Sequence, residues 1–418
     1  MKITTAGPSV PALGEEALRR RSCAYTAAAA DIPGDDPLSS LFAEIDPVAD
    51  SAMTYFYGHL VAIQPQIGPM FPPAMDDQRR RFYRALCYIA ANRGNAGELA
   101  AYLAALGRGH RKFGVQEDHF DAVRRALAAT WRRYAPRAWT ADTAAAWDDL
   151  FTEAAAQMTR AAERDAETTP AWWLAEIVWH EVRGGDLAVL TLLPSQPLHH
   201  LPGQHISVQV PRWPRLWRDY SIANAPHADG TLTLHVRAVP GGLVSAALVH
   251  HVTAGDTLLL GAPAGTMTVD LASPRDVLCL AGGTGLAPVK AVIEAVIAGA
   301  GDDVAAGTAS ETGTAAGTGR RREIVLYVGA RRARGLYDWA DLRRMAAGYP
   351  GLHIIPVLSD EAAPHLAHGT IPQMVAGASW EGRDIYIGGP DEMTERTVTA
   401  LKSRGAPGDL IHYDAAQF

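Results

Sequence analysis

Cysteine is scarce in this sequence, and no two cysteines stand at the spacing of metal ligands. The three present, Cys23, Cys87 and Cys279, lie far apart in 418 residues and form no CxxC pair. This pattern argues against both a disulfide framework and a cysteine metal site. A reducing cytoplasm is therefore the expected compartment.

Long apolar runs and basic stripes are also missing. The most apolar stretch, residues 277–297, is interrupted by Lys290, Glu294 and glycines, whereas a membrane helix needs roughly 20 mostly apolar residues. The N-terminus lacks the apolar core of a signal peptide. Because the formal net charge is −7 and the basic residues are scattered, we expect no nucleic-acid partner and no membrane span. The pattern indicates no particular oligomeric state.

What the sequence does contain is enough apolar residues, 48% of 418, to fill two or three domains. Residues 1–35 mix Pro, Gly, Ala and charge without periodicity, which predicts a disordered tail. Residues 36–168 show helical periodicity and predict an all-α domain. Residues 172–271 contain short apolar runs at strand spacing, typical of an antiparallel β-barrel. Residues 274–418 alternate buried strands with helices, as in a parallel α/β sheet, around a Gly/Ala/Thr-rich segment, 299–319, that predicts a disordered insertion.

A segment entering one predicted strand, Arg218-Asp219-Tyr220-Ser221, has the composition of a flavin site. A guanidinium can hold a diphosphate with paired hydrogen bonds, an aromatic ring can lie against the flavin, and a hydroxyl can bond its pyrimidine edge. His205, on the preceding predicted strand, is a further candidate FAD ligand. An ordinary half-buried strand is the alternative, and the tetrapeptide alone fits it equally well.

Downstream of this segment, a second turn could face a phosphate. Gly242, Leu243, Val244 and Ser245 could begin a helix whose backbone N–H groups have no intrahelical partner. Gly242, Val244 and Ser245 are therefore further candidate FAD-binding residues. This signal is weak alone and gains weight from its place after the strand.

Two glycine turns then follow buried strands in the α/β region, where a backbone without Cβ atoms can approach a pyrophosphate. The first comprises Gly282, Gly283, Thr284, Gly285, Leu286, Ala287 and Pro288, and leads into a helical stretch. The second, Gly388, Gly389 and Pro390, follows the predicted strand 384–387. The spacing differs from G-x-G-x-x-G, so the ordinary dinucleotide fingerprint does not apply. The alternative is two tight turns of purely structural use.

The order of these motifs resembles the ferredoxin-NADP reductase-like superfamily over about residues 172–418. R-D-Y-S, A-G-G-T-G-L-A-P and I-G-G-P stand in that superfamily's order. The resemblance implies an FAD barrel and a domain for NADH or NADPH, with a hydride passed to the flavin and single electrons passed onward. Members often have a cysteine where this chain has Gly388. Many carry an aromatic residue near the C-terminus over the flavin, a role that the resemblance gives to Phe418.

In the helical domain, His110 ends an apolar helical face, so its imidazole is expected to point inward. Upstream, Tyr57 and Gln78 occupy inward positions, and Phe71 lies in a proline-rich turn between them. A lone histidine on such a face is usually a core residue with satisfied hydrogen bonds. For the tyrosine and the glutamine the alternatives are helix packing and an exposed polar face.

Together, these four residues resemble the globin pattern of flavohaemoglobins. The resemblance implies that His110 is the metal ligand of haem b, that Tyr57 and Gln78 are distal catalytic residues, and that Phe71 packs on the haem. Neutral imidazole does ligate haem iron, and hydroxyl and amide groups can donate hydrogen bonds to dioxygen.

One departure from that pattern concerns the groups behind the proximal histidine. Flavohaemoglobins usually carry a tyrosine and a glutamate that bond the other nitrogen of this histidine and raise its basicity. Phe120 stands where the tyrosine is expected, and either Glu153 or Glu163 could be the glutamate. The chain resembles the divergent flavohaemoglobins of some bacteria.

The leading functional interpretation is an NAD(P)H-dependent nitric oxide dioxygenase, with nitric oxide and dioxygen as substrates. An alternative enzyme passes electrons through the same flavin to another haem-linked acceptor or has a peroxide-related role. A haem-based sensor or binding protein for dioxygen or nitric oxide is a third possibility, although the sequence contains no recognisable output domain. Arg331 and Arg332 could meet a 2′-phosphate, but exposed arginine pairs are common and we expect NADH.

Overall fold

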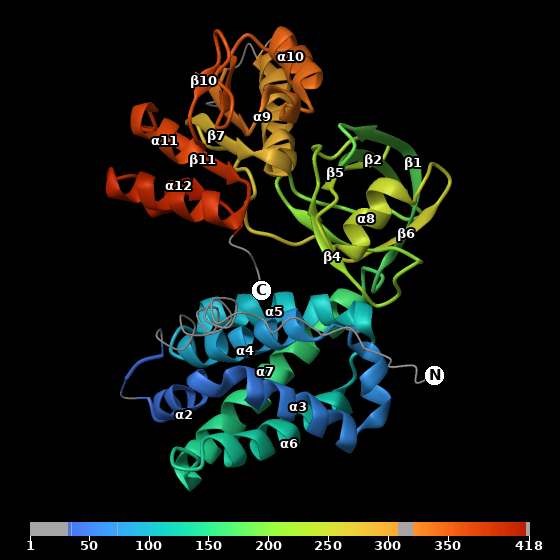
Figure 1. Cartoon of the computed structure of the whole chain (residues 1–418), viewed down its shortest axis with the longest axis vertical. Helices are drawn as coiled ribbons and strands as arrows, with labels where there is room; N and C mark the ends of the chain where they lie inside the picture. The colour runs from blue at the N-terminus through green and yellow to red at the C-terminus, as the bar shows by residue number, and fades with distance from the viewer. Residues whose placement is uncertain (1–31, 35, 73, 308–320, 415–418) are drawn as a thin grey trace, which may run out of the picture. The chain divides into compact units, whose positions relative to one another are not determined.

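A computed structural model of the chain describes residues 32–34, 36–72, 74–307 and 321–414. They form two compact units that divide between Thr169 and Pro170 (Figure 1). Most of the expected tail, the later part of the expected insertion and Phe418 lie outside the described residues.

The described part of the first unit is helical. Its α-helices are α2 (Pro37–Ile45), α3 (Ala49–Ile63), α4 (Asp76–Ala91), α5 (Ala96–His110), α6 (Glu117–Tyr134) and α7 (Ala141–Ala166). Local signals set their ends. Asp36 accepts the Leu38 N–H at 2.8 Å and Pro37 takes the first position of α2, where a missing N–H costs nothing. Beyond α5, Gly114 adopts a left-handed conformation (φ 69°) that turns the chain toward α6.

The apolar core of this unit is divided into two clusters. The larger one contains Phe42, Phe56, Tyr57 and Trp131, contributed by α2, α3 and α6. The smaller one joins α5 to α7 and includes Leu103, which is fully buried. Half-buried apolar side chains border both clusters, namely Met75, Phe71 and Phe82 on the first and Ile89, Tyr102, Leu106 and Phe120 on the second.

The second unit begins with an antiparallel sheet. Its strands are β1 (Trp173–Arg183), β2 (Leu187–Pro194), β3 (His205–Gln209), β4 (Arg218–Ser221), β5 (Leu232–Arg237) and β6 (Thr257–Leu260), and they lie in the order β4-β3-β6-β1-β2-β5. The Ala223 N–H donates to the Thr233 carbonyl at 2.8 Å, and Ile222 pairs with Leu234, so the two edges meet. The sheet closes into a barrel, accompanied by the short helix α8 (Leu243–His250).

A parallel sheet completes the unit. Its strands are β7 (Asp276–Gly282), β8 (Ile324–Ala330), β9 (Leu352–Leu358), β10 (Ala367–His368), β11 (Arg383–Gly388) and β12 (Ile411–His412), in the order β10-β9-β8-β7-β11-β12. Helices α9 (Leu286–Gly307) and α10 (Trp339–Gly348) lie on one side, and α11 (Ile371–Met374) and α12 (Asp391–Ser403) on the other (Figure 1). Alternation along β7 explains this layering, because Val277 and Cys279 join the α9 cluster while Leu278 and Leu280 join the α12 cluster.

The three folds expected from the sequence, all-α, antiparallel barrel and parallel α/β, are confirmed. The segment 299–319 behaves differently at its start, because α9 continues to Gly307 and so includes residues 299–307. No helix among the described residues is long and apolar enough to cross a membrane.

Candidate functional site

The orientation of the His110 ring is set by its own helix. Its Nδ1 lies 2.7 Å from the carbonyl oxygen of Leu106, one turn earlier in α5. A carbonyl only accepts hydrogen bonds, so Nδ1 carries the proton and the lone pair is on Nε2. Burial lowers the pKa of His110, which keeps the imidazole neutral. This is the form that can ligate a haem iron.

Two other histidines of this unit have local roles. The Nδ1 of His119 accepts the Gln116 N–H at 3.0 Å, which caps the start of α6. The ring of His59 stacks on Tyr55 with their centroids 5.6 Å apart. Neither ring has the arrangement of His110 at the end of an apolar helical face.

Three of the residues expected around a haem are brought together from α3, α4 and the segment between them. The Gln78 amide donates to the Tyr57 hydroxyl oxygen at 3.1 Å, and the phenol is buried with 7% exposure. The Phe71 ring meets the Tyr57 ring edge-on, with centroids 5.0 Å apart. The amide and the ring therefore fix the orientation of the phenol.

The groups expected behind His110 are arranged differently from the usual flavohaemoglobin pattern. Phe120 packs on the apolar cluster of α5 and α7. Glu153 is exposed and accepts hydrogen bonds from Gln157 and Arg160, and Glu163 is also exposed. Among the described residues, Leu106 is the recorded hydrogen-bond partner of His110, so a neutral carbonyl takes the place of a carboxylate.

In the barrel, the residues of the flavin segment divide between the two faces of β4. Alternation places Arg218 and Tyr220 on one face and Asp219 and Ser221 on the other. The Asp219 carboxylate accepts the Ser207 hydroxyl at 2.6 Å across the strand pair, so it has a structural partner. The Arg218 guanidinium donates to the Trp217 carbonyl at 2.9 Å, and Tyr220 packs on the barrel core.

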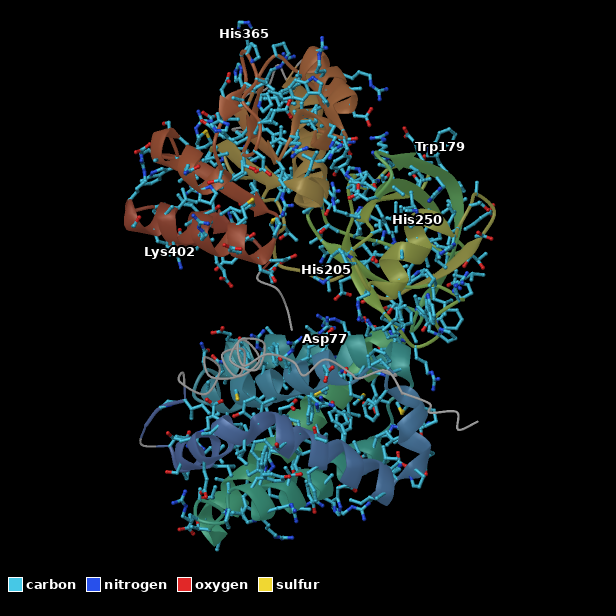
Figure 2. The ribbon with its side chains drawn as sticks, in the orientation of Figure 1. Asp77, Trp179, His205, His250, His365 and Lys402 are labelled. Atoms are coloured by element: carbon cyan, nitrogen blue, oxygen red, sulfur yellow. The ribbon has the colours of Figure 1, made fainter. Side chains whose placement is uncertain are left out.

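A histidine–aspartate pair that the motifs did not reveal lies beside this segment. His205 pairs directly with Ser221 across β3 and β4, and its Nδ1 lies 3.3 Å from the Asp414 carboxylate (Figure 2 labels His205). The other oxygen of Asp414 accepts the Thr266 N–H at 2.8 Å. A Cβ on Gly265, which has φ +108°, would lie 2.6 Å from Asp414 and 2.9 Å from His205. The pair thus needs a glycine there, and the last described residue is tied to the barrel.

The turn at Gly242 begins α8, as expected. The Ser245 hydroxyl donates to the Gly242 carbonyl at 3.2 Å and accepts the Val239 N–H at 3.3 Å, and Val244 is buried. These two side chains support the turn, which leaves the first backbone N–H groups of the helix as the groups that could face a phosphate.

The two glycine turns predicted separately form one structure. They follow the adjacent parallel strands β7 and β11, and a Cβ on Gly285 would lie 2.2 Å from the backbone of both Gly388 and Gly389. Thr284 and its flanking glycines are half-buried, whereas Leu286, Ala287 and Pro288 are buried in the first turn of α9. Pro390 precedes α12. Close backbone packing therefore explains the glycines, and it aims the start of α9 at the carboxyl edge of the sheet, where open α/β sheets bind ligands.

Residues that follow β7 and β8 gather at this edge. They include Gly283, Gly329, Gly335, Tyr337 and Asp338. The arginines expected near a 2′-phosphate, 331 and 332, are exposed just after β8. The predicted nicotinamide motif therefore lies at the carboxyl edge of the sheet.

Comparison with known proteins agrees with this geometry. Residues 54–158 match the globin family, residues 176–269 match the oxidoreductase FAD-binding domain and residues 279–399 match the oxidoreductase NAD-binding domain. A crystal structure of a flavohaemoglobin from Malassezia yamatoensis with bound FAD and haem superposes with a TM-score of 0.70 and 16% identity, over 93% of this chain and 99% of that one. The chain has the fold of a flavohaemoglobin.

Several curated relatives are electron-transfer or reductase components, and each matches about half of this chain. The xylene/toluene monooxygenase electron transfer component of Pseudomonas putida is 30% identical over 55% of this chain and 61% of its own length. The reductase subunit of an aromatic O-demethylase from Amycolatopsis sp. is 31% identical over 52% of this chain and 61% of its own. The chain thus spans less than two thirds of the length of these relatives.

The matched domains imply that the chain uses haem, FAD and NAD(P)H as cofactors. Residues in each domain suit the cofactor expected there. A neutral imidazole presents Nε2 for iron, and half-buried apolar side chains border both core clusters of the helical unit, as a large apolar ring requires. At Gly283 no atom lies within 4 Å of the place of a Cβ, so a phosphate can approach the backbone of the first glycine turn.

We predict that His110→Ala abolishes haem binding while NADH-dependent reduction of a soluble dye by the flavin is retained, because the two sites lie in different units. The Soret band of the purified variant and its dye reductase rate are the measurements. His59→Ala is the matched control and should keep the band. A wild-type Soret band in His110→Ala would show that another group binds the iron.

We predict that Arg218→Ala and Ser221→Ala each lower the FAD content of the purified protein, because they remove groups expected to hold the diphosphate and the pyrimidine edge. Flavin absorbance per protein after gel filtration measures this. Arg212→Ala, an exposed arginine ahead of β4, is the control. Full FAD occupancy in both test variants would contradict the flavin assignment.

We predict that Asp414→Asn destabilises the reductase unit by about 1–2 kcal/mol at pH 7. Burial acts to raise the pKa of Asp414, but hydrogen bonds from His205 and from the backbone lower it overall. A lowered carboxyl pKa contributes stability above the ordinary carboxyl pKa, about 3.9, and that stability is lost as the pH falls through the folded value.

The difference between wild type and Asp414→Asn in the urea midpoint of FAD release should therefore shrink as the pH falls below about 4. Asp409→Asn, which changes an exposed carboxylate nearby, is the control. A difference that stays constant with pH would contradict the role of the charged form.

Proposed function

We propose that the chain is an NAD(P)H-dependent nitric oxide dioxygenase that combines nitric oxide with dioxygen to form nitrate. The observation that carries this proposal is the hydrogen-bonded Tyr57–Gln78 pair in a globin fused to a reductase. Each turnover of this reaction requires one electron beyond those of the two gases, and NAD(P)H supplies electrons in pairs. A flavin domain in the same chain is suited to divide the pair.

The side chains have distinct roles in this proposal. His110 would hold the iron through Nε2, because Nδ1 keeps its proton in a hydrogen bond donated to the Leu106 carbonyl. Tyr57 and Gln78 orient dioxygen by hydrogen bonding, and Phe71 holds the phenol in place. In the reductase unit, Arg218 and Ser221 hold the flavin. Bound FAD and haem would supply the redox chemistry that these residues lack.

The proximal arrangement supports dioxygen chemistry over a peroxide-related role. A carboxylate behind a ligating histidine raises the basicity of the ring, whereas a neutral carbonyl does so much less. The described residues offer His110 the Leu106 carbonyl and place Glu153 and Glu163 in exposed positions.

A second candidate function follows from the reductase part. Its curated relatives include the electron transfer component of a monooxygenase and a demethylase reductase subunit. In this alternative the chain would pass electrons from the flavin through the haem to a different acceptor, and dioxygen and nitric oxide would not be its substrates. Nitrate production separates the two functions.

The domain limits 36–168, 172–271 and 274–418 belong to the same proposal, and each matched family range lies within one of them. We propose NADH as the donor, because Arg331 and Arg332 are exposed on the turn after β8, where arginine pairs are common without binding a phosphate. The described cysteines, Cys87 and Cys279, are buried free thiols, which suits a reducing cytoplasm.

We predict that the wild-type protein forms nitrate from nitric oxide in air, at two nitrate per nicotinamide by electron balance. Tyr57→Phe should release dioxygen about fivefold faster, because one hydrogen bond is worth about 1 kcal/mol, and should make less nitrate per nicotinamide. Ion chromatography for nitrate and rapid mixing for dioxygen release are the measurements.

Tyr55→Phe is the control for this prediction, because it changes another tyrosine of α3 whose ring stacks on His59. Nicotinamide oxidation without nitrate in the wild type would reject the dioxygenase and favour the second candidate. Unchanged dioxygen release in Tyr57→Phe would reject the distal role of this tyrosine.

A further inference from the structure

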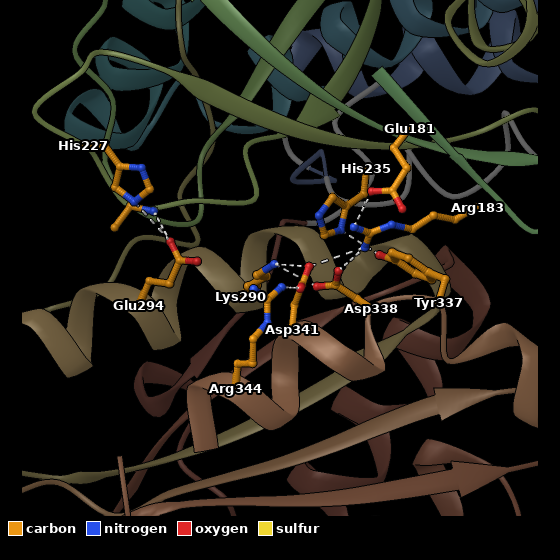
Figure 3. A network of polar contacts seen from close by, with 11 residues as sticks. Glu181, Arg183, His227, His235, Lys290, Glu294, Tyr337, Asp338, Asp341 and Arg344 are labelled. Atoms are coloured by element: carbon orange, nitrogen blue, oxygen red, sulfur yellow. Dashed lines mark hydrogen bonds and ion pairs between the residues drawn. The ribbon is translucent and has the colours of Figure 1, made fainter. Parts of the chain in front are cut away.

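The barrel and the parallel sheet meet at a buried carboxylate, that of Asp338. Its side chain has 0% exposure and stands at the start of α10. One oxygen accepts from the Arg183 guanidinium at 2.5 Å and the other from the Lys290 ammonium at 2.9 Å (Figure 3). Arg183 ends β1 of the barrel, whereas Lys290 belongs to α9 of the sheet domain. One carboxylate therefore joins the two domains.

The charges around Asp338 balance within a small network. The acidic members are Glu181, Asp338 and Asp341, and the basic members are Arg183, Lys290 and Arg344. Asp338 occupies the N-cap position of α10, yet its side chain makes no capping hydrogen bond. Aspartate at this position usually caps the helix, but here its carboxylate binds basic side chains from two domains.

Two neighbouring contacts follow the same boundary. Tyr337 and His235 of β5 are joined by a hydrogen bond of 2.8 Å. Burial lowers the pKa of His235 well below its usual value, and the positive charges of Lys290 and Arg183 lower it further. Glu294, one turn after Lys290 in α9, accepts the Ala225 N–H of the barrel at 3.0 Å (Figure 3). One face of α9 thus contacts the barrel through both Lys290 and Glu294.

The elements that carry this network also carry the candidate nicotinamide site. Helix α9 begins at the glycine turn Gly283–Gly285, and Tyr337 and Asp338 lie beside that turn at the carboxyl edge of the sheet. The barrel on the other side of the network carries the flavin segment of β4. The network therefore connects the supports of the two redox sites.

We propose that Asp338 is a positioning residue. Through Arg183 and Lys290 it fixes the position and orientation of the nicotinamide domain relative to the FAD barrel. Buried ion pairs seldom stabilise a protein more than apolar packing does, but they accept only a narrow geometry. Transfer of a hydride requires the reacting atoms within about 3–3.5 Å, and an error of about 1 Å can cost about 100-fold in rate. A geometrically strict contact between the two domains meets that requirement.

This inference rests on NAD(P)H-dependent flavin reduction and not on the reaction at the haem. Absence of nitrate formation would reject the dioxygenase while leaving the role of Asp338 intact. A normal rate of flavin reduction in the variants below would reject the role of Asp338 while leaving the dioxygenase intact.

The test uses the full-length holoprotein with Asp338→Asn, which removes the charge and keeps the shape. In anaerobic rapid mixing, the limiting rate of flavin reduction at saturating NADH should fall about 100-fold. The dissociation constant for NADH, read from the concentration dependence, and the FAD content should stay close to wild type. Arg183→Lys keeps the charge but loses the planar fork, so a smaller fall is expected.

Glu323→Gln is the matched control, since it changes an exposed carboxylate paired with His353 in the same domain to an amide and should leave the rate unchanged. An unchanged limiting rate in Asp338→Asn overturns the proposal. Weaker NADH binding at a normal limiting rate also overturns it, because Asp338 would then be a nucleotide contact. A loss of rate that is fully explained by a loss of FAD overturns it as well. If Asp338→Asn does not fold, Arg183→Lys decides, and a wild-type limiting rate in that variant overturns the proposal.

Discussion

The close contact between two backbone turns, at Gly285 and at Gly388 with Gly389, is the constraint on which the reductase unit depends. Any Cβ on Gly285 would collide with the turn after β11, so the two adjacent strands can end together only with glycines there. That contact fixes the point at which α9 begins. Because α9 is rigid, its start also determines where Lys290 and Glu294 meet the barrel. The glycine turn of the candidate nucleotide site and the boundary between the two domains thus share one origin.

In the helical unit, the corresponding constraint is a core divided in two. Helices α3 and α6 pack in one cluster and α5 with α7 in another, and half-buried aromatic and aliphatic side chains border both. A single continuous core would bury more apolar surface without a ligand. In the same unit, His110 is anchored by its own helix rather than by a neighbouring carboxylate.

The two units differ in their relatives, and this difference bears on function. The reductase part is similar in sequence to reductase components of oxygenase systems, whereas the whole chain shares its fold with a flavohaemoglobin at low identity. Reduction of a flavin by nicotinamide depends on the relative position of the two domains. In our proposal, the contacts of Asp338 with Arg183 and Lys290 restrict that position. In the proposed function, the reaction at the haem depends on Tyr57, Gln78 and the groups behind His110.

The sequence alone determined the three fold types and the positions of the glycine turns, because periodicity and glycine signals are local. A helix-end signal also made His110 the candidate for the haem ligand. It also paired Tyr57 with Gln78 by pattern, which the structure joins by a hydrogen bond. Only the tertiary structure decided the partners of Asp338. It also decided the hydrogen bond between Asp414 and His205, which are 209 residues apart along the chain. Such contacts leave no periodic signal, since a buried charge is stabilised by whichever distant cation the fold brings to it.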